Sequence, residues 1–355
     1  MTYQSLGVWD IDSQAELGHA TAADDPRRHQ VINFAVSPDG SSLVYLESDI
    51  LFGGLRRDPW IGVQRWNINT SRGLPALADL PRSGEHRLTA VSVGHNGAVA
   101  AISDSHVVRV WQAVSGTPKI INQLHGALCA VVSPRQRLVV AAIPQLPAIR
   151  MWDFEHNRIY GKDLAVSGPS PDLPVCPVFA GNGSLLAYAS SDKLWIWQVS
   201  TGELLGTPLN RDLRSIKEIV FSPDGRLLFT VIGEGGAELW DVETQQMLGT
   251  PFEMEKIMQT RGGVAFSPDG LHIAVGWGQR SIMTIYDNVL SDWPELACTR
   301  ANRNLSQMEW RHYFGARVTY HKTCKQFPDG EGVDAPPKVV GVTGAPNFRA
   351  ASNKP

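Results

Sequence analysis

The chain of 355 residues contains no run of 18 apolar residues, so its sequence offers no helix long enough to cross a membrane. Neither sign of charge is in excess, because 32 lysine and arginine residues stand against 35 aspartate and glutamate residues. Proteins that bind nucleic acid typically show a basic surface, which this balance does not predict. Residues 1–14 lack the basic and apolar segments of a secretory signal. We therefore expect a cytoplasmic protein that binds neither membranes nor nucleic acid.

Cysteine is scarce, with four residues in the chain and no Cys-x-x-Cys pair. This number does not indicate the disulfide framework of a small secreted domain. Cys129 begins an apolar segment and Cys176 stands between two prolines, and we expect both to be unpaired, buried side chains. Cys298 and Cys324 flank a predicted helical segment. We expect free thiols there too. A disulfide is the alternative, and it requires the two Cα atoms to lie within about 7 Å of each other.

Motifs of catalysis are also missing. The sequence has no Gly-x-Ser-x-Gly elbow, no Gly-x-x-x-x-Gly-Lys-Ser/Thr loop and no His-Glu-x-x-His motif. Its ten histidines show no metal-ligand spacing. We expect no cofactor, no metal and no enzymatic activity, with one alternative left open, which is a site assembled from loops distant in the sequence.

What the chain does contain is a repeated unit, clearest in residues 218–241. A short apolar segment leads into Ser222-Pro223-Asp224-Gly225, and two further apolar segments follow, the last ending in Trp240-Asp241. Pro presets φ, Asp bonds its own backbone and Gly accepts a positive φ, so these four residues predict a tight turn. Short apolar segments bounded by turn residues predict buried strands rather than helix.

Copies of this unit run along most of the chain. The turn recurs, closely or in outline, at residues 37–40, 94–97, 133–136, 180–183 and 267–270. The aromatic residue of the third strand recurs at steps of 41 to 46 residues, at Trp66, Trp111, Trp152, Trp197, Trp240 and Tyr286. A three-stranded meander cannot bury both of its faces alone, so each unit needs copies of itself on either side.

A period of about 40–45 residues, with a hairpin turn and a third strand ending in Trp-Asp, resembles the repeats of WD-repeat β-propellers. The resemblance covers residues 1–290 and implies an all-β fold of four-stranded blades. One feature of many family members is missing at the expected position, because no Gly-His dipeptide precedes the first strand of the unit. The resemblance therefore does not imply the His–Asp network that the family builds within each blade.

The chain begins inside a repeat, since Gly7-Val8-Trp9-Asp10 predicts a third strand and residues 14–18 predict a fourth. Two arrangements are open. Residues 14–18 could supply the fourth strand of the blade ending at Tyr286, which would close a ring of six. Alternatively, both strands belong to another blade, whose first two strands come from the C-terminal tail or were lost with an upstream segment. We favour seven blades, six legible repeats and one partial repeat, the commonest number in the resembled family.

Residues 291–326 predict a short helical appendage docked against the propeller. Ser306 and Glu309 form a capping box, and a short amphipathic helix follows, with Met308, Trp310, His312, Tyr313 and Phe314. The apolar residues Leu296, Ala297, Ala301 and Leu305 predict a preceding helix. Residues 297–324 resemble the tail that follows the WD repeats of bacterial signalling proteins, including STAND-class NTPases and kinase-linked proteins. Residues 327–355 are rich in Gly, Pro and polar residues and predict a flexible tail.

Two groups of residues are candidates for binding. A polar residue stands eight positions before each turn, and if the register holds these six approach one mouth of the central channel: His29, His86, His125, Asp172, Arg214 and Gln259. The second group lies in the largest insertion, residues 47–61, where Trp60, Arg56 and Arg57 are of the types that anchor protein partners. Each has a simpler interpretation, namely polar residues at the entry of a strand and a Trp60 that packs on its own blade.

The sequence thus predicts a non-catalytic scaffold or sensor module that presents loops on a rigid propeller to protein or peptide partners. The main alternative is a small-ligand binder or hydrolase-like enzyme with a site at the mouth of the channel. A degraded repeat fragment without a partner is a third interpretation. We expect a monomeric propeller, which could once have been part of a longer multidomain chain.

Overall fold

In the computed structural model the chain divides into two compact units, residues 1–287 and residues 288–355, and each is treated by itself. The structure describes residues 5–332 except 11–12, 14, 22–28, 50–60, 81–87, 104, 113–117, 144–145, 147, 167–175, 191–192, 207–208, 211–215, 233–235, 249–251, 254–262, 278–281, 288–297, 299–300 and 315–318.

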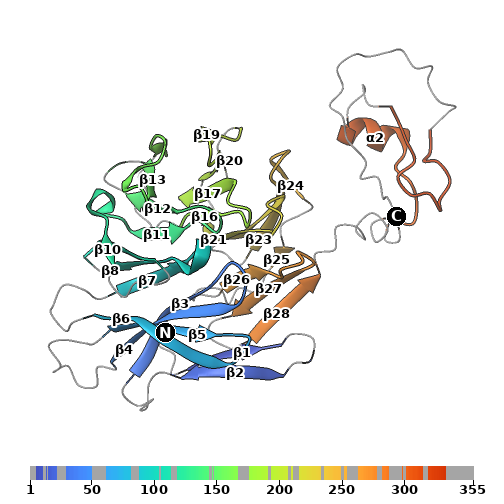
Figure 1. The fold of residues 1–355 in the computed structure, drawn as a ribbon. Coiled ribbons are helices and arrows are strands. Elements are labelled where there is room, and N and C mark those ends of the chain that lie inside the picture. Colours follow the sequence, from blue (N-terminus) through green and yellow to red (C-terminus); the bar gives the residue numbers. More distant parts are fainter. Residues whose placement is uncertain are drawn as a thin grey trace. The chain divides into compact units, whose positions relative to one another are not determined.

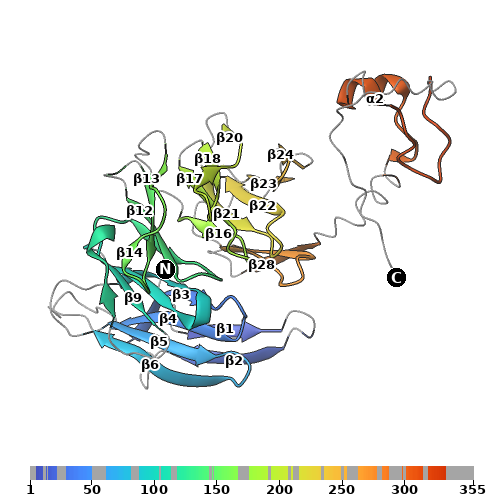
Figure 2. The same cartoon turned by 45° about the horizontal axis from the view of Figure 1, so that its top comes forward.

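The first unit consists of antiparallel sheets, seven of them within the described residues. Six sheets coincide with the six repeats of the sequence, here numbered 1 to 6 in chain order. In each repeat strands a, b and c pair in sequence order, and a strand d lies outside c in repeats 1–5. Figures 1 and 2 show the sheets following one another around a common centre, with the a strands innermost. The architecture is a WD-repeat-like β-propeller, as the sequence predicts.

The strands have the following bounds. Repeat 1 comprises β3 (His29–Val36), β4 (Ser42–Asp49), β5 (Ile61–Asn67) and β6 (Arg72–Leu80). Repeat 2 comprises β7 (Leu88–Val93), β8 (Val99–Ser103), β9 (Val108–Trp111) and β10 (Lys119–Ile120), with short 3₁₀ helices η1 (His95–Gly97) and η2 (Asn122–Leu124). Repeat 3 comprises β11 (Cys129–Val132), β12 (Leu138–Ile143), β13 (Ala148–Asp153), β14 (Arg158–Ile159) and β15 (Leu164–Ala165).

Repeat 4 comprises β16 (Val178–Phe179), β17 (Leu185–Ser190), β18 (Lys193–Gln198), β19 (Glu203–Leu204) and β20 (Leu209–Asn210). Repeat 5 comprises β21 (Ile216–Phe221), β22 (Leu227–Ile232), β23 (Gly236–Asp241), β24 (Gln246–Met247) and β25 (Phe252–Glu253). Repeat 6 comprises β26 (Gly263–Phe266), β27 (His272–Trp277) and β28 (Ile282–Asp287). A seventh, N-terminal sheet pairs β1 (Ser5–Trp9) with β2 (Glu16–Thr21).

The a–b turns form as their residues predict. In repeat 5 the Ser222 hydroxyl donates to Asp224 Oδ1 at 2.6 Å and accepts the Leu227 N–H at 2.9 Å. Gly225 donates its N–H to the Ser222 carbonyl and has a φ of +74°, where a side chain would be strained. The turns of repeats 1 and 6 repeat this bonding around Ser37 and Ser267. The serine is thus an integral part of the turn.

The core lies between neighbouring sheets. Buried apolar clusters join repeats 1 and 2, repeats 2 and 3, repeats 3 and 4, and repeats 4 and 5. The third-strand tryptophans at positions 66, 111, 152, 197 and 240 are all at most 7% exposed. The acidic residue after Trp240 builds the next turn, because Asp241 Oδ1 accepts both the N–H and the hydroxyl of Thr244. The repeating Trp-Asp therefore ends one strand and starts the c–d turn.

The N-terminal sheet decides between the two arrangements open in the sequence. β2 pairs with β1, whereas β28 pairs only with β27 among the described strands, so the idea that residues 14–18 complete the blade of Tyr286 is wrong. Asp10 Oδ1 accepts the N–H and hydroxyl of Ser13, as Asp241 does with Thr244. β1 and β2 are therefore the c and d strands of a separate sheet, and seven blades in a closed ring stay a prediction.

The second unit is held together by the side chain of Asn304, which is 2% exposed. Its amide nitrogen donates to three carbonyls, those of Cys324, Phe327 and Pro328, and its oxygen accepts the Cys324 N–H at 2.7 Å. Helix α2 (Gln307–Phe314) starts with the predicted capping box, since Ser306 N donates to Glu309 Oε2 and Glu309 N donates to Ser306 Oγ. Trp310, 1% exposed, packs edge-on against Tyr320 and His321.

Three expectations for this unit need correction. Met308 is 82% exposed, so it does not belong to the buried apolar face of the helix, on which Trp310 lies. Ala301 is helical but exposed, and the described part of the predicted preceding helix is one turn closed by Asn302 N and the Cys298 carbonyl. Residues 327–332, assigned from sequence to a flexible tail, belong to this unit because Asn304 binds two of their carbonyls.

All four cysteines are paired, which contradicts the prediction of free thiols. Cys129 is bonded to Cys176 and Cys298 to Cys324, with Cα–Cα distances of 5.5 and 5.4 Å. Cys129 is buried as expected, but Cys176 is exposed. The prediction failed because the partners lie 47 and 26 residues apart in the sequence and meet only through the packing of repeats and of the second unit.

Candidate functional site

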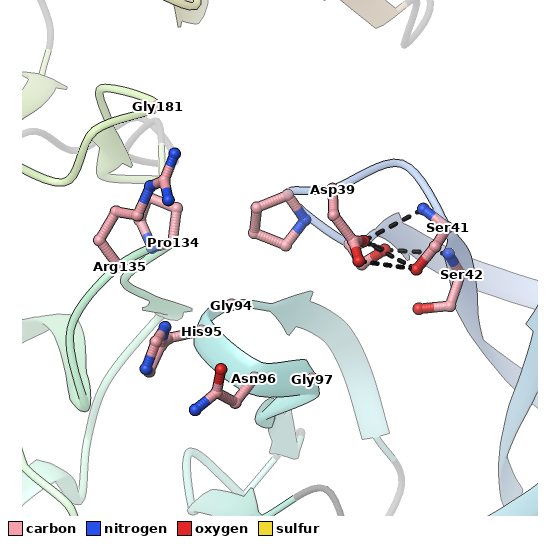
Figure 3. Close-up of a pocket in the computed structure, with 12 residues that line it drawn as sticks. Asp39, Ser41, Ser42, Gly94, His95, Asn96, Gly97, Pro134, Arg135 and Gly181 are labelled. Carbon is pink, nitrogen blue, oxygen red and sulfur yellow. Dashed lines mark hydrogen bonds between the residues drawn. The ribbon is translucent and has the colours of Figure 1, made fainter.

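Four a–b turns meet around a cavity of about 440 Å³, here called the turn pocket. Repeat 1 contributes Pro38 and Asp39, repeat 2 His95 and Asn96, repeat 3 Pro134 and Arg135, and repeat 4 Gly181. Figure 3 shows Asp39 with Ser41 and Ser42 on one side of the hollow, and Arg135, Pro134 and His95 on the other. The pocket thus brings together residues far apart in the sequence, such as Asp39 and Arg135, which are 96 positions apart.

Asp39 provides a fixed negative charge on its side of the pocket. Its carboxylate accepts the Ser37 hydroxyl at 2.5 Å, the Ser41 hydroxyl at 2.8 Å and the Ser41 N–H at 3.1 Å. These hydrogen bonds, the one from Ser37 first, hold the pKa of the Asp39 carboxyl below its ordinary value of 3.8. The carboxylate is exposed and ionised at neutral pH, and the serines hold its orientation.

The opposite side carries donors. Arg135 is exposed, and its guanidinium forms no ion pair with any residue that the structure describes. Neighbouring Arg137, by contrast, is paired with Glu155. The ring of His95 and the amide of Asn96 likewise make no side-chain hydrogen bond within the described ranges. One side of the pocket is therefore acidic, and the other carries side-chain N–H donors that have no acceptor among the described residues.

The turns of repeats 2, 3 and 4 are held in place by contacts between successive repeats. His95 N donates to the Ser133 carbonyl at 2.8 Å, which joins the turns of repeats 2 and 3. Gly94 leaves no room for a side chain, since a Cβ there would lie 2.5 Å from that same carbonyl oxygen and against Val132. A Cβ on Gly183 would approach Arg135 and Ser133 at 3.2–3.3 Å, and one on Gly181 would lie 2.7 Å from the Pro223 carbonyl. The glycines are thus required by the neighbouring repeat.

The arrangement of Ser, His and Asp in the pocket is not that of a hydrolase. A nucleophilic serine needs a base within hydrogen-bond reach of its hydroxyl. Here the hydroxyls of Ser37 and Ser41 donate to Asp39, and no described hydrogen bond connects His95 to a serine. The chemistry that this pocket supports is recognition by charge and hydrogen bonding.

In repeats 1, 3 and 5, the residue four positions before the turn also bonds to the next repeat. Asn33 Oδ1 accepts the Val91 N–H at 3.2 Å, and Glu218 Oε1 accepts the Val264 N–H at 3.2 Å. Cys129 and Cys176 occupy this same position in repeats 3 and 4, where the disulfide makes the connection. Burial raises the pKa of the Glu218 carboxyl from 4.5 to about 7, against the opposing effect of the Val264 hydrogen bond.

A second candidate surface lies on β3. Residues one and three positions before the turn pack on the preceding sheet in repeats 2, 3 and 5, where Val93, Val132 and Phe221 are 8%, 4% and 6% exposed. In repeat 1 the equivalent Val36 and Phe34 are 48% and 51% exposed. These two residues, here called the β3 face, pair with Leu43 and Tyr45, whose side chains pack with Leu6 and Val8 of β1.

The physical reason for this exposure is the composition of the N-terminal sheet. Its described strands are only β1 and β2, the c and d strands, and no described strand lies inside β1. β1 therefore covers the middle strand of repeat 1 and, on its inner strand, Val31, but it leaves Phe34 and Val36 exposed. Trp9, on β1, is 59% exposed as well. An exposed apolar area beside an unpaired strand edge is typical of an interaction surface.

The residues predicted as sites from the sequence are mostly not tested. Trp60, Arg56 and Arg57 lie outside the described residues, as do His86, Asp172, Arg214 and Gln259. His29 is the first residue of β3, with a side chain outside the description, and His125 is exposed at the end of η2. The proposed ring therefore remains a prediction, and it concerns the ends of the a strands opposite to the turn pocket.

The turn pocket was missed in the sequence although a signal was present. The third residue of the turn changes around the propeller, from Asp39 in repeat 1 to Asn96, Arg135 and Asn182 in repeats 2–4 and back to Asp224 and Asp269. We interpreted these residues as turn chemistry alone. Recognising the site required knowing that the turns converge.

Comparison with known proteins places the fold among repeat proteins. No family model matches the chain. It is 31% identical over 175 residues to the nuclear distribution protein PAC1 of Arthroderma benhamiae, a match that covers 44% of this chain and 36% of that protein. It is 26% identical over 137 residues to the human apoptotic protease-activating factor 1, and 26% identical over 150 residues to the Protein LST8 homolog of Drosophila melanogaster. These relatives are WD-repeat proteins.

The similarity supports a WD-repeat assignment and extends only over part of each relative. The matched region is 34% of this chain and 10% of the human protein, and 39% of this chain and 46% of the Drosophila protein. The chain thus spans less than half the length of these relatives. Within the described residues, no helix combines the length and apolar character needed to cross a membrane, and no three metal-ligating side chains form a group.

Proposed function

We propose that this WD-repeat-like propeller is a non-catalytic protein-interaction module, and that a partner segment docks on the β3 face beside the open edge of β1. The observation that carries the proposal is the exposure of Phe34 and Val36, 51% and 48%, at positions that are buried in repeats 2, 3 and 5. In those repeats the preceding sheet supplies the cover. An added β-strand on β1 would supply it here.

β-strand addition fits the chemistry of this edge. Strand b pairs with strand c in all six numbered repeats, whereas β1 offers its inner N–H and C=O groups to no described strand. Main-chain hydrogen bonds to such an edge provide affinity, and side chains at alternate positions provide specificity. The partner segment is therefore expected to be extended, with apolar residues on the side that faces Phe34 and Val36.

The test replaces these two exposed residues by threonine, which is β-branched and suited to a strand. The Phe34→Thr/Val36→Thr variant should retain the fold and lose partner capture from cells of the source organism. A matched control is Ile120→Thr/Ile159→Thr, which changes two apolar residues with 51% and 44% exposure on the outer strands β10 and β14. Amide hydrogen exchange in the recovered complex should slow down at alternate residues of β1, those whose N–H groups point away from β2.

Three outcomes would contradict the proposal. If capture survives in Phe34→Thr/Val36→Thr and is lost in Trp60→Ala, the interface belongs to the predicted insertion around Trp60, Arg56 and Arg57. If exchange on β1 does not change when the partner binds, the segment does not add to this strand. Protection of β1 by residues 333–355 of the same chain would make the face an intramolecular contact.

The finer features of the function are also proposals. The resemblance of residues 297–324 to the tails of bacterial signalling proteins supports a sensor or docking role in signalling. We propose a monomeric propeller that binds protein or peptide and not nucleic acid. Its cytoplasmic location stays a prediction, and the two disulfides count against a thiol-reducing compartment. Mass spectrometry of thiol-blocked protein from its native source distinguishes a thiol-reducing compartment from an oxidising one, because only free cysteines react with the blocking reagent.

A further inference from the structure

We propose that the turn pocket is a second, separate binding site, which takes an extended peptide segment carrying one acidic and one basic side chain. The acidic side chain would bind Arg135 and His95, and the basic side chain would bind Asp39. The proposal does not depend on the β3 face.

The pocket carries opposite charges on its two sides. Asp39 is ionised and oriented by three hydrogen bonds, so it does not have to be rearranged to accept a cation. Arg135, on the other side, has a guanidinium without an ion pair in the described part of the chain. A guanidinium presents a planar set of donors that matches a carboxylate. A ligand with both charges satisfies both walls.

The lining of the pocket suits a peptide segment. Pro38 and Pro134 offer apolar ring surfaces, and Gly97 and Gly181 expose backbone without a side chain. A volume of about 440 Å³ lies within the range of ligand sites and is enough for a few residues of a peptide. The contacts among the turns of repeats 2, 3 and 4 hold that side of the pocket before binding, which lowers the entropic cost of association.

The two charges of the pocket also disfavour other classes of ligand. A nucleic acid would bring phosphates against Asp39, and a polybasic segment would bring cations against Arg135. Both encounters place like charges together, which disfavours binding. A segment with one charge of each sign avoids both penalties. This selection follows from Asp39 and Arg135 standing on opposite walls rather than beside each other (Figure 3).

The experiment uses the full chain and synthetic probes whose ends are blocked, so that only side chains are charged. Fluorescent peptides carry one Glu and one Lys separated by one, two or three residues. Matched peptides replace the Glu by Gln, or the Lys by Gln. At the best spacing, we expect the peptide with both charges to bind at least about fivefold tighter than either Gln peptide. Each Gln peptide loses one of the two charge pairs with the pocket.

Two conservative variants assign the charges to the walls. Asp39→Asn should preserve the turn, because Asn182 already fills this place in repeat 4 and accepts the N–H and hydroxyl of Ser184. It should weaken the dipolar probe but not the probe that lacks Lys. Arg135→Gln should weaken the dipolar probe but not the probe that lacks Glu. The matched controls Asp224→Asn and Arg226→Gln lie in the turn of repeat 5, outside the lining, and should change neither.

The proposal falls if no dipolar probe binds, if all probes bind equally, or if the repeat 5 variants weaken binding as much as the pocket variants. These results leave the proposed function intact, because partner capture through the β3 face is measured with different residues. If a mixture of free lysine and free glutamate binds as tightly as the peptide with both charges, the pocket is a small-molecule site. That result also overturns the peptide assignment.

Discussion

Cys129 and Cys176 join the inner strand of repeat 3 to the segment that enters the inner strand of repeat 4, with their Cα atoms 5.5 Å apart. Both cysteines stand four residues before the a–b turn of their repeat. At that position Asn33 and Glu218 connect their own repeats to the next by a hydrogen bond to a backbone N–H. One position in the repeat thus connects neighbouring sheets by two kinds of bond.

The disulfide between repeats 3 and 4 should contribute strongly to the stability of the propeller. We expect Cys129→Ser/Cys176→Ser to lower the free energy of unfolding by about 2–4 kcal/mol, because the unfolded chain regains the freedom of the closed loop. Denaturant unfolding followed by tryptophan fluorescence measures the change. Cys298→Ser/Cys324→Ser is the matched control, since that bond lies in the other unit. An unchanged propeller transition after loss of the first bond would contradict this prediction.

Glu218 should make stability depend on pH. The folded protein holds the Glu218 proton up to about pH 7, whereas the unfolded chain releases it near its ordinary pKa of 4.5. The folded state binds more protons between these values, so the free energy of unfolding falls as pH rises through this window. The decrease is at most about 3 kcal/mol, from the difference between the two pKa values.

Glu218→Gln isolates this effect, because a glutamine still accepts the Val264 N–H but does not titrate. The variant should be less sensitive than the wild type to a change from about pH 5 to about pH 8 in denaturant unfolding. Glu243→Gln, at an exposed position, serves as the control. Equal pH dependence in the wild type and Glu218→Gln would show that Glu218 does not carry it.

Gly94 should not tolerate a side chain. Gly94→Ala would place a Cβ against Val132 and 2.5 Å from the Ser133 carbonyl oxygen, so the turns of repeats 2 and 3 would have to separate. We expect a loss of about 1–3 kcal/mol, as for other overpacked sites. Gly73→Ala is the control, because a Cβ there meets nothing within 4 Å. Thermal unfolding should separate the two variants clearly, and similar melting temperatures would contradict the contact.

Asn304 should determine whether the second unit folds. Asn304→Ala leaves the carbonyls of Cys324, Phe327 and Pro328 without their shared donor in a buried position. We expect a loss of about 3 kcal/mol or more, because unsatisfied buried polar groups are costly. Hydrogen exchange of α2 measures it directly. Met308→Ala, at a residue 82% exposed, should leave exchange unchanged, and equal effects of the two substitutions would contradict the role of Asn304.

Residue types and their spacing are sufficient to predict the repeat and its local structure. Ser222, Asp224 and Gly225 specify a turn through bonds within a few residues, and Trp240-Asp241 ends a strand and starts the next turn. The capping box at Ser306 and Glu309 is local in the same way. Such features could be predicted because the interacting atoms belong to neighbouring residues.

The tertiary structure decided what depends on the packing of one repeat against another. Cys129 and Cys176 are 47 residues apart in the sequence, and Asp39 and Arg135 nearly one hundred. Only the packing of successive sheets brings these pairs to one position or one cavity. The exposure of Phe34 and Val36 likewise depends on a preceding sheet whose described strands are only two. Local residue types determine the strands and turns of each repeat. Contacts between repeats determine where the candidate binding sites form.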